Sequence, residues 1–308
     1  MQEMIDSAVL DLSHLTSAAQ TAAMLPNSER VRKIRSERWI SYTLAQKALV
    51  ELDDLFNWPS RQRMQNMLLV GETNNGKSMI IEKFRRQYLP RFSEDGSKEI
   101  VPIVIMQMPS EPSIARFYTM LLYAMNAPIS GRPRVPELEI LSLRLMKATN
   151  VRMLIIDELH NLLSGGPAVR HEFLNLLRFL GNELRIPIVG VGTADAYSAI
   201  RRDPQLENRF KPFILPKWQE GDEIEALLAS FVAAFPLRRA SDLHNPEMIR
   251  YILARTEGTI GEIATFLTAA AIVAIETNEE AINSKILAIT DYESSTERRQ
   301  KFSPDIVQ

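Results

Sequence analysis

The chain of 308 residues has no cysteine, 45% hydrophobic and 24% charged residues, and a formal net charge of -2, from 36 Lys plus Arg against 38 Asp plus Glu. This composition excludes collagen-like, low-complexity and wholly disordered proteins. The lack of cysteine excludes disulfide scaffolds, thiol catalysis and cysteine-based zinc sites. The near-neutral charge means that any nucleic-acid partner must be inferred from local groups of cations.

The N-terminal residues 1–25 carry three acidic side chains and lack both a basic stretch and an unbroken apolar core. They therefore do not resemble a secretory signal. No stretch of the chain reaches the roughly 18 apolar residues that are needed to span a bilayer. We therefore expect a cytoplasmic protein with no membrane partner.

The predicted elements begin with a helical pattern over residues 29–56, which Trp58-Pro59 ends. Short apolar runs then predict strands at 67–70, 100–105, 153–156 and 186–191, and more weakly at 213–215. Helical patterns lie between them at 77–88, 113–125, 136–147 and 169–184. The first four strands lack polar alternation, as expected for strands that are covered on both faces. The alternation of strands and helices predicts an α/β fold with a mainly parallel sheet.

After Pro216 the strand signals cease, and helical patterns occupy residues 220–234, 246–256, 260–275 and 281–289. We therefore expect an α/β domain over residues 29–216 and a smaller helical domain over residues 217–293. The remaining residues 1–28 and 294–308 are polar or irregular, so we expect mobile tails at both ends.

The strongest chemical signal is the segment Gly71-Glu72-Thr73-Asn74-Asn75-Gly76-Lys77-Ser78, which matches G-x-x-x-x-G-K-[ST] at every fixed position. It follows a predicted strand and opens a predicted helix, the setting in which a helix N-terminus binds phosphate. The backbone amides would face a phosphate, Lys77 would reach the β- and γ-phosphates, and the Ser78 hydroxyl would ligate Mg²⁺. The alternative, a turn with a purely structural role, is much less favoured by this context.

A second signal is the apolar run 153–156 followed by Asp157 and Glu158. A buried strand would deliver both carboxylates to the carboxyl edge of the sheet, beside the phosphate loop. Asp157 would hold Mg²⁺ through water, and Glu158 would activate the attacking water as a general base. Acidic residues are common at helix N-termini in any protein, so this pair indicates a nucleotide site only in combination with the phosphate loop.

Two further polar residues follow or precede predicted strands. Thr193 ends the strand 186–191 and could contact the γ-phosphate or the attacking water, or could merely cap the next helix. Arg209 precedes the last strand and could act in trans on the nucleotide of a neighbouring subunit. The alternative for Arg209 is a surface ion pair with Glu207 or Asp203.

The phosphate loop, Asp157-Glu158-Leu159-His160, Gly192-Thr193, Glu207-Asn208-Arg209-Phe210 and the distal Glu257-Gly258-Thr259-Ile260-Gly261 together resemble the TniB/TnsC group of AAA+ transposition ATPases. The resemblance covers about residues 30–288. It implies an AAA+ P-loop fold with a small C-terminal helical lid. It also implies an ATP-dependent regulator that assembles as a ring or helical filament on double-stranded DNA. A TniQ-type target-selection protein or a CRISPR effector and a DDE-type transposase are the implied partners.

By the same resemblance, residues 71–78 and Met79 bind ATP, Ser78 and Asp157 serve Mg²⁺, and Glu158 serves hydrolysis. Thr193 is the residue that senses the γ-phosphate, and Arg209 is the candidate arginine finger. The pattern departs from that of many AAA+ proteins at Glu262, where a cation that touches the γ-phosphate is usual. Arg255 is a possible substitute for that cation.

Local cations occur in two groups. The first lies on the first helical segment and comprises Arg30, Arg32, Lys33, Arg35 and Arg38, which form either a solvated helix face or a DNA or partner surface. The second comprises Arg132 and Arg134, in a loop between two predicted helices. The resemblance favours DNA contacts from Ser113, Arg116, Arg132 and Arg134. Because one subunit offers so few cations, we expect DNA binding to depend on ATP-driven assembly.

Two alternative functions remain open at this stage. One is a helicase loader or initiator-type ATPase, which would share the fold and the motifs. The other is a nucleotide-gated scaffold with little turnover, which the absence of a cation at Glu262 would favour.

Overall fold

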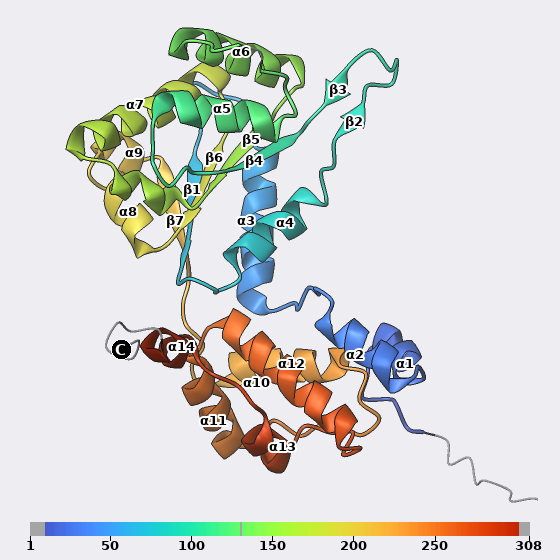
Figure 1. Ribbon diagram of the computed structural model, residues 1–308. Coiled ribbons are helices and arrows are strands. Elements are labelled where there is room, and N and C mark those ends of the chain that lie inside the picture. The colour runs from blue at the N-terminus through green and yellow to red at the C-terminus, as the bar shows by residue number, and fades with distance from the viewer. Residues whose placement is uncertain (1–9, 130, 302–308) are drawn as a thin grey trace, which may run out of the picture. The chain divides into compact units, whose positions relative to one another are not determined.

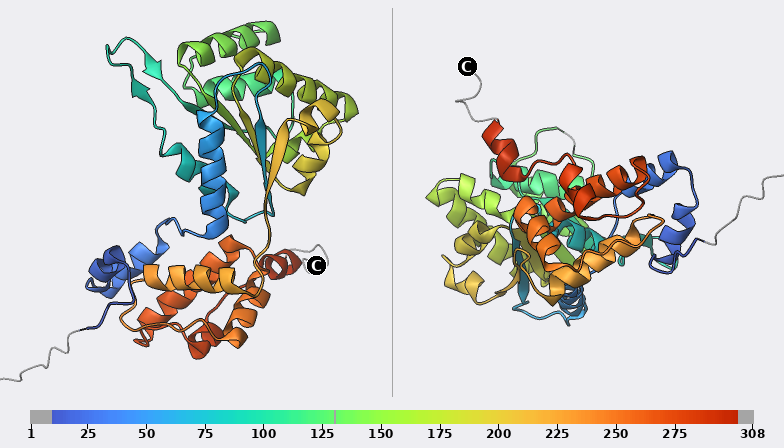
Figure 2. Two further views of the ribbon diagram at one scale, coloured as in Figure 1. Left: turned by 180° about the vertical axis from the view of Figure 1, so that it is seen from behind. Right: turned by 90° about the horizontal axis from the view of Figure 1, so that it is seen from below.

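The computed structural model describes residues 10–129 and 131–301, which divide into two compact units. Residues 44–216 form an α/β unit, and the N-terminal residues up to Thr43 join residues from Lys217 onward in a helical unit. Figures 1 and 2 show the elements of each unit. Among the described residues no single helix is long and apolar enough to cross a membrane. One pair of helices, Pro246–Thr256 and Ile260–Glu276, passes that test only when taken together, and the two helices meet at 114°.

The α/β unit is built on a five-stranded parallel sheet in the order β4-β5-β6-β1-β7. Its strands are β1 (Asn66–Gly71), β4 (Ile103–Gln107), β5 (Met153–Asp157), β6 (Ile188–Gly192) and β7 (Phe210–Leu215). β1, β5 and β6 are almost wholly buried, which explains their unbroken apolar sequences. The predicted α/β class with a parallel sheet is confirmed.

Helices cover both faces of the sheet (Figure 1). One face carries α3 (Thr43–Asn57) and α4 (Lys77–Arg85), whose aromatic residues Phe56 and Phe84 pack edge to face. The other carries α5 (Ile114–Ala124), α6 (Val135–Ala148), α7 (Pro167–Leu184), α8 (Ala194–Ile200) and the short α9 (Pro204–Glu207). The division follows from right-handed crossovers, because the chain moves one way along the sheet from β1 to β4 and the other way afterwards.

Two elements of this unit differ from the predicted pattern. The apolar run 100–105 is divided at Pro102, so Ile100 belongs to β3 (Glu99–Ile100) and only Ile103 onward belongs to β4. β3 pairs with β2 (Arg91–Phe92) as a short antiparallel hairpin that projects from the unit (Figure 1). A short 3-10 helix, η1 (Leu159–Ser164), connects β5 to α7.

The helical unit has its own hydrophobic core. Its helices are α1 (Ser17–Ala23), α2 (Asn27–Arg35), α10 (Asp222–Ala234), α11 (Pro246–Thr256), α12 (Ile260–Glu276), α13 (Ser284–Ile289) and α14 (Ser295–Lys301). Ile34 of α2 belongs to the same buried cluster as the apolar residues of α10–α13. The guanidinium of Arg30 is fully buried, donates to the carbonyl of Pro236 and forms an ion pair with Glu280.

The predicted domain boundaries need correction at both ends. Residues 29–43 pack with the helical unit rather than with the α/β unit, because Arg30 and Ile34 are buried there. The segments predicted as mobile tails contain α1 and α14, while residues 1–9 and 302–308 lie outside the described residues. The helical pattern 29–56 is also two helices, since Arg38 donates to the carbonyls of Lys33 and Ile34 at the end of α2.

Candidate functional site

The carboxyl ends of β1, β6 and β5 lie side by side at one edge of the sheet. β6 stands between the other two, with Leu68 of β1 opposite Gly190 and Ile155 of β5 opposite Val189. The segments that follow these three strands are the phosphate loop, Thr193, and the acidic pair. The strand order therefore brings together three predicted site segments that are far apart in the sequence.

The phosphate loop has the geometry that its sequence predicts. α4 begins at Lys77, and Gly76 before it has a φ of 79°, in the left-handed region that favours glycine. Asn74 also lies in that region, with a φ of 61°. The loop therefore turns sharply into a helix N-terminus, where the first backbone amides have no partner within the helix.

Lys77 is buried within the loop. Its ammonium donates to the carbonyl of Gly71 at 2.9 Å and to that of Glu72 at 2.7 Å. Burial lowers the pKa of Lys77, and the nearby carboxylates of Glu158, Asp157 and Glu72 oppose that effect only in part. The charge of Lys77 is thus held close to both acidic residues that follow β5.

Asn75 fixes the loop to the neighbouring strand. Its side-chain amide donates to the carbonyls of Leu215 and Pro216, each at 3.0 Å, at the end of β7. The position is variable in the G-x-x-x-x-G-K-[ST] pattern, so its sequence gives no hint of this role. Asn75, one of the predicted cofactor-binding residues, therefore also orients the loop.

The phosphate loop and the acidic pair meet directly. The hydroxyl of Ser78 donates to Asp157 Oδ2 at 3.0 Å, and Asp157 Oδ1 accepts from the backbone amide of Glu158 at 2.8 Å. Hydroxyl and carboxylate oxygens are the ligands that Mg²⁺ prefers, and it usually takes only one or two from the protein. The described residues contain no group of three or more His, Cys, Asp or Glu side chains that could hold a metal. The pair Ser78 and Asp157 therefore fits a magnesium ion that is completed by phosphate and water.

Glu158 occupies a strained turn beside His160. Its φ of 55° is in the left-handed region, which is unusual for a glutamate and is often found at functional sites. Glu158 Oε2 lies 3.2 Å from His160 Nε2. His160 Nδ1 is buried and has no hydrogen-bond partner among the described residues. The sequence pattern itself indicates no role for His160 beyond its place in the acidic motif.

Thr193 immediately precedes α8 but does not cap it with its side chain. No capping hydrogen bond is made, and Thr193 Oγ1 is buried without a partner among the described residues. The alternative role as a helix cap is therefore not observed. A buried hydroxyl that lacks a partner is uncommon and needs an explanation, which a ligand would supply.

Arg209 lies at the opposite edge of the sheet from the phosphate loop. Its backbone carbonyl accepts from the amide of Asn66, at the start of β1, at 2.8 Å. The six residues of β1 then span about 20 Å before the loop begins. The Arg209 guanidinium donates to Asn182 at 2.9 Å, while Glu207 pairs with Arg201, so the expected alternative pair with Glu207 is absent.

The environment of Arg209 is electropositive. Partial burial lowers the pKa of Arg209, and the charges of Arg63 and Arg178 lower it further. Asp203, the other partner considered for Arg209, pairs instead with Arg178 at 3.5 Å. The arginine is therefore held at the surface by a neutral amide, without a carboxylate of its own.

The four residues expected to contact DNA form two separate groups. Ser113 caps α5 by accepting from the amide of Arg116, whose side chain pairs with Glu111 at 3.4 Å. Arg132 and Arg134 lie after the end of α5, and both are exposed. Arg116 lies near the start of the 11-residue α5, whereas Arg132 and Arg134 lie between the end of α5 and the start of α6.

The first group of cations is reduced by burial. Arg30 is fully buried and Arg38 bonds the carbonyl of Ala234, so neither belongs to an exposed helix face. Arg32, Lys33 and Arg35 remain exposed on α2. This helix offers three cations where the sequence suggested five.

Glu262 is part of a buried network in the helical unit. Its carboxylate accepts from the hydroxyls of Tyr292 at 2.5 Å and Ser295 at 2.9 Å, and pairs with Arg298 at 2.7 Å. Gly258, four residues before Glu262, has a φ of 67°, and a β-carbon there would lie 2.7 Å from the carbonyl oxygen of Trp218. The segment 257–261 is thus a tight turn that only glycine allows at its second position.

Arg255 and Arg298 both hold the C-terminal segment. Arg255 donates to the carbonyl of Tyr292 and lies 3.5 Å from Glu297, while Arg298 pairs with Glu262. Arg255, the expected substitute for the missing cation, therefore has partners within the helical unit.

Comparisons with known proteins place these features in a wider group. The family model described as bacterial TniB protein matches residues 30–220. The solved structure of the Aeropyrum pernix ORC1 protein in complex with DNA is 13% identical, with a TM-score of 0.58 over 88% of this chain and 69% of that chain. Cdc6p from Pyrobaculum aerophilum is 17% identical, with a TM-score of 0.55 over 84% and 68% of the two chains.

A third structure, the Aeropyrum pernix ORC2 protein in ADPNP-ADP complexes, is 17% identical, with a TM-score of 0.51 over 88% of this chain and 74% of that chain. At these identities the similarity shows a shared fold alone. That fold is the AAA+ arrangement of a five-stranded parallel sheet followed by helices.

Proposed function

Because the chain belongs to the TniB family of transposition proteins, which are AAA+ ATPases, we propose that it is an ATP-dependent regulator of DNA transposition. It binds ATP and Mg²⁺, oligomerises on double-stranded DNA and links target selection to a DDE-type transposase. A TniQ-type protein, with or without a CRISPR effector, supplies the target-selection signal. These partners rest on the family resemblance.

The hydrogen bond between Ser78 and Asp157 is the observation that carries the proposal. The loop amides and Lys77 hold the phosphates, and Ser78 and Asp157 hold the metal. When bound, Mg²⁺ neutralises charge on the β- and γ-phosphates. Glu158, whose backbone is fixed by Asp157, accepts the proton of the attacking water as general base.

Thr193 completes the site from the middle strand. β6 stands between the strands that carry the phosphate loop and the acidic pair, so its end faces the space between them. The buried hydroxyl of Thr193 can donate to a γ-phosphate oxygen or orient the attacking water. That role supplies the partner which the hydroxyl lacks among the described residues.

Arg209 supports an oligomer. It is about 20 Å from the loop of its own chain, at the other end of β1, so it is too far to reach a nucleotide bound there. A neighbouring subunit can bring its Arg209 to this nucleotide, and such arginine fingers accelerate hydrolysis by about 10³–10⁵.

DNA binding follows from assembly. The net charge of -2 and the small number of candidate cations, Arg116, Arg132 and Arg134, give one subunit few contacts with phosphates. Repetition of these residues along an oligomer multiplies the weak contacts into stable binding. Such contacts are made to the phosphates of the DNA backbone, so they give little sequence specificity.

The test compares wild type with Glu158→Gln and Lys77→Ala in assays of ATP binding, ATP hydrolysis and duplex DNA binding. Glu158→Gln should bind ATP normally, lose turnover by about 10²–10⁴ and remain longer on DNA. Lys77→Ala should lose ATP binding and DNA-bound assemblies together. Glu172→Gln, an exposed glutamate on α7, is the matched control and should behave as wild type.

Three outcomes would contradict the proposal. Normal turnover in Glu158→Gln would remove the assigned general base. Tight binding of DNA by monomeric Lys77→Ala would separate DNA binding from assembly. Particles that stay monomeric in electron micrographs with ATP and duplex DNA would rule out the oligomer. Hydrolysis that is negligible with and without DNA would favour a nucleotide-gated scaffold.

A further inference from the structure

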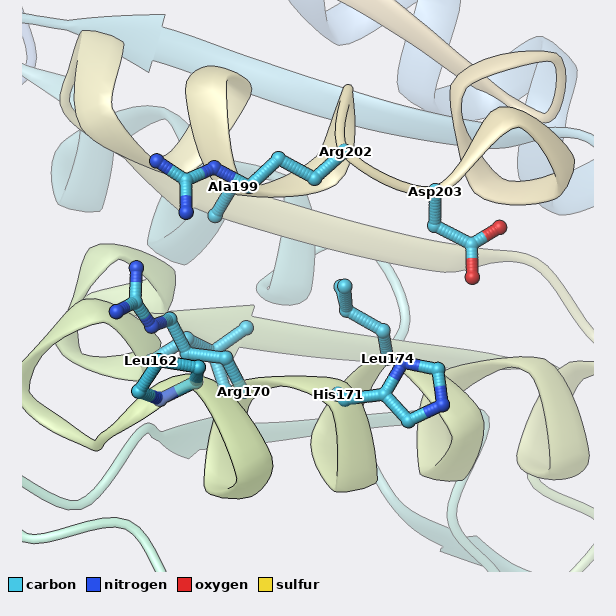
Figure 3. A pocket seen from close by; sticks show the side chains of 8 residues that line it. Leu162, Arg170, His171, Leu174, Ala199, Arg202 and Asp203 are labelled. Atoms are coloured by element: carbon cyan, nitrogen blue, oxygen red, sulfur yellow. The ribbon is translucent and has the colours of Figure 1, made fainter.

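A cavity of about 180 Å³ lies between α7 and the end of α8 in the α/β unit (Figure 3). Its apolar lining includes Leu162, Pro167 and Leu174. Its polar lining comprises two arginines on opposite sides, Arg170 from α7 and Arg202 from the turn after α8, together with His171 and Asp203. None of these residues belongs to the proposed nucleotide site.

The cations of this cavity have no partners within the described part of the chain. Arg170 Nε is buried and makes no hydrogen bond there. The side chains of His171 and Arg202 form no hydrogen bond or ion pair with described residues either. An unpaired guanidinium nitrogen removed from water is costly, because it has lost its hydration without gaining an acceptor.

Asp203 is the one carboxylate in the lining, and it is already occupied. Its Oδ1 caps α9 by accepting from the amides of Gln205 at 2.9 Å and Leu206 at 3.2 Å. Its Oδ2 lies 3.5 Å from Arg178. Figure 3 shows the Asp203 carboxylate away from the two guanidinium groups. The cavity therefore keeps a net positive charge.

We propose that this cavity binds a carboxylate side chain from an acidic segment of a partner protein. Arg170 and Arg202 offer planar guanidinium donors, which match the two oxygens of a carboxylate. His171 adds a ring nitrogen that can donate a hydrogen bond. The volume is below the roughly 300–1,000 Å³ of pockets for drug-sized ligands, so it suits one side chain rather than a whole cofactor.

The apolar walls favour a peptide over nucleic acid. Leu162 and Leu174 can pack against the aliphatic stem of a glutamate, whereas a DNA phosphate has no such stem. A DNA duplex is also stiff, so its phosphates are usually contacted by exposed cationic side chains on a protein surface. A carboxylate at the end of a flexible side chain can enter a cavity between two helices.

The experiment uses the full chain and a short fluorescein-labelled peptide that repeats glycine, glutamate, leucine and glutamate. Fluorescence anisotropy should detect its binding, and the same peptide with glutamine in place of glutamate should bind much more weakly. Arg170→Gln and Arg202→Gln should each weaken binding of the acidic peptide by about 10–100-fold, as expected for a lost charged hydrogen bond. Arg144→Gln, an exposed arginine on α6, should have no effect.

A second measurement remains informative if a variant is unstable. In ¹⁵N spectra of arginine side chains, the Nε–H signal that Arg170→Lys removes should shift when the acidic peptide is added to wild type. No binding to wild type, or equal binding to Arg144→Gln and both cavity variants, would overturn the proposal. A loss of duplex DNA binding in the cavity variants with unchanged peptide binding would assign the cavity to nucleic acid instead.

Discussion

The backbone carbonyl of Arg209 accepts a hydrogen bond from the amide of Asn66, which fixes Arg209 at the opposite end of β1 from the phosphate loop. The residue therefore has to act between subunits if it acts on ATP. We expect Arg209→Ala to bind ATP normally and to lose about 10³-fold or more in turnover.

Mixing two inactive proteins checks this arrangement. Arg209→Ala subunits keep Glu158, and Glu158→Gln subunits bind ATP, assemble and still carry Arg209, so mixed oligomers should regain part of the ATPase activity. Arg144→Ala mixed with Glu158→Gln serves as the control for dilution of active subunits. A mixture that stays as inactive as its components would exclude action in trans.

The contact between Ser78 and Asp157 predicts coupled effects on magnesium. Ser78→Ala and Asp157→Asn should each raise the Mg²⁺ concentration needed for half-maximal ATPase activity, and the double variant should be little worse than Asp157→Asn alone. Mg²⁺ titrations of the ATPase rate measure this directly. Ser198→Ala, an exposed serine on α8, should leave the titration unchanged. Additive losses would show that the two side chains act at separate sites.

His160 predicts an effect on turnover rather than on binding. Because it lies 3.2 Å from Glu158, His160→Ala should lower kcat by about tenfold and leave KM nearly constant. His160→Gln keeps a nitrogen donor and should recover part of the loss. Steady-state kinetics decide the matter, with His244→Ala in the helical unit as control. A rise in KM with constant kcat would contradict a positioning role.

The buried pair of Arg30 and Glu280 predicts a large effect on stability. Arg30→Met should lower the free energy of unfolding by about 3–5 kcal/mol, because it leaves the Glu280 carboxylate buried without its cation. Replacing both by methionine should be less harmful than replacing Arg30 alone. Denaturant unfolding followed by circular dichroism gives these values. Arg32→Ala, on the exposed face of α2, should change them by less than about 0.5 kcal/mol.

Glu262 predicts a loss of stability in acid. Burial by itself raises the pKa of Glu262, but hydrogen bonds from Tyr292, Arg298 and Ser295 outweigh it and hold the pKa below its ordinary value of 4.5. A carboxylate whose pKa is lower in the folded state stabilises the protein above the unfolded pKa, and this contribution is lost as pH falls through the folded pKa. Wild type should therefore lose stability below about pH 4.5 more steeply than Glu262→Gln. Urea titrations between neutral pH and pH 3 measure the difference, and parallel curves would contradict it.

The parts of the candidate nucleotide site can each be predicted from a short segment of the sequence. The fixed positions of the phosphate loop need no knowledge of the rest of the chain. The buried strand before Asp157 already indicates that its carboxylate reaches the sheet edge. What could not be predicted is the orientation by Asn75, since its partners Leu215 and Pro216 lie about 140 residues away. The contact of His160 with Glu158 also depends on the left-handed turn at Glu158.

The domain boundaries were predicted poorly for a related reason. No proline or glycine interrupts residues 36–42, so the helical pattern continues from Glu29 to Phe56 in the sequence. The helix breaks where the Arg38 guanidinium donates to the carbonyls of Lys33 and Ile34 at the end of α2 and to the carbonyl of Ala234. The contact with Ala234 is distant in the sequence, so no local pattern predicts it. The C-terminal segment likewise has a polar sequence, and its helix α14 is held by the distant Glu262.

The helical unit contains both the beginning and the end of the described chain, with the α/β unit inserted between them. Arg30 therefore leaves the ribosome 250 residues before Glu280, the carboxylate with which it is buried. At about 5–20 residues per second this interval lasts roughly 12–50 s. During this interval the α/β unit can fold, whereas the apolar residues of α1 and α2 stay exposed to water, because the helices that bury them have not yet been synthesised. The α/β unit is thus expected to fold before the helical unit. A chain arrested before Glu280 should contain a folded α/β unit and an unfolded helical unit.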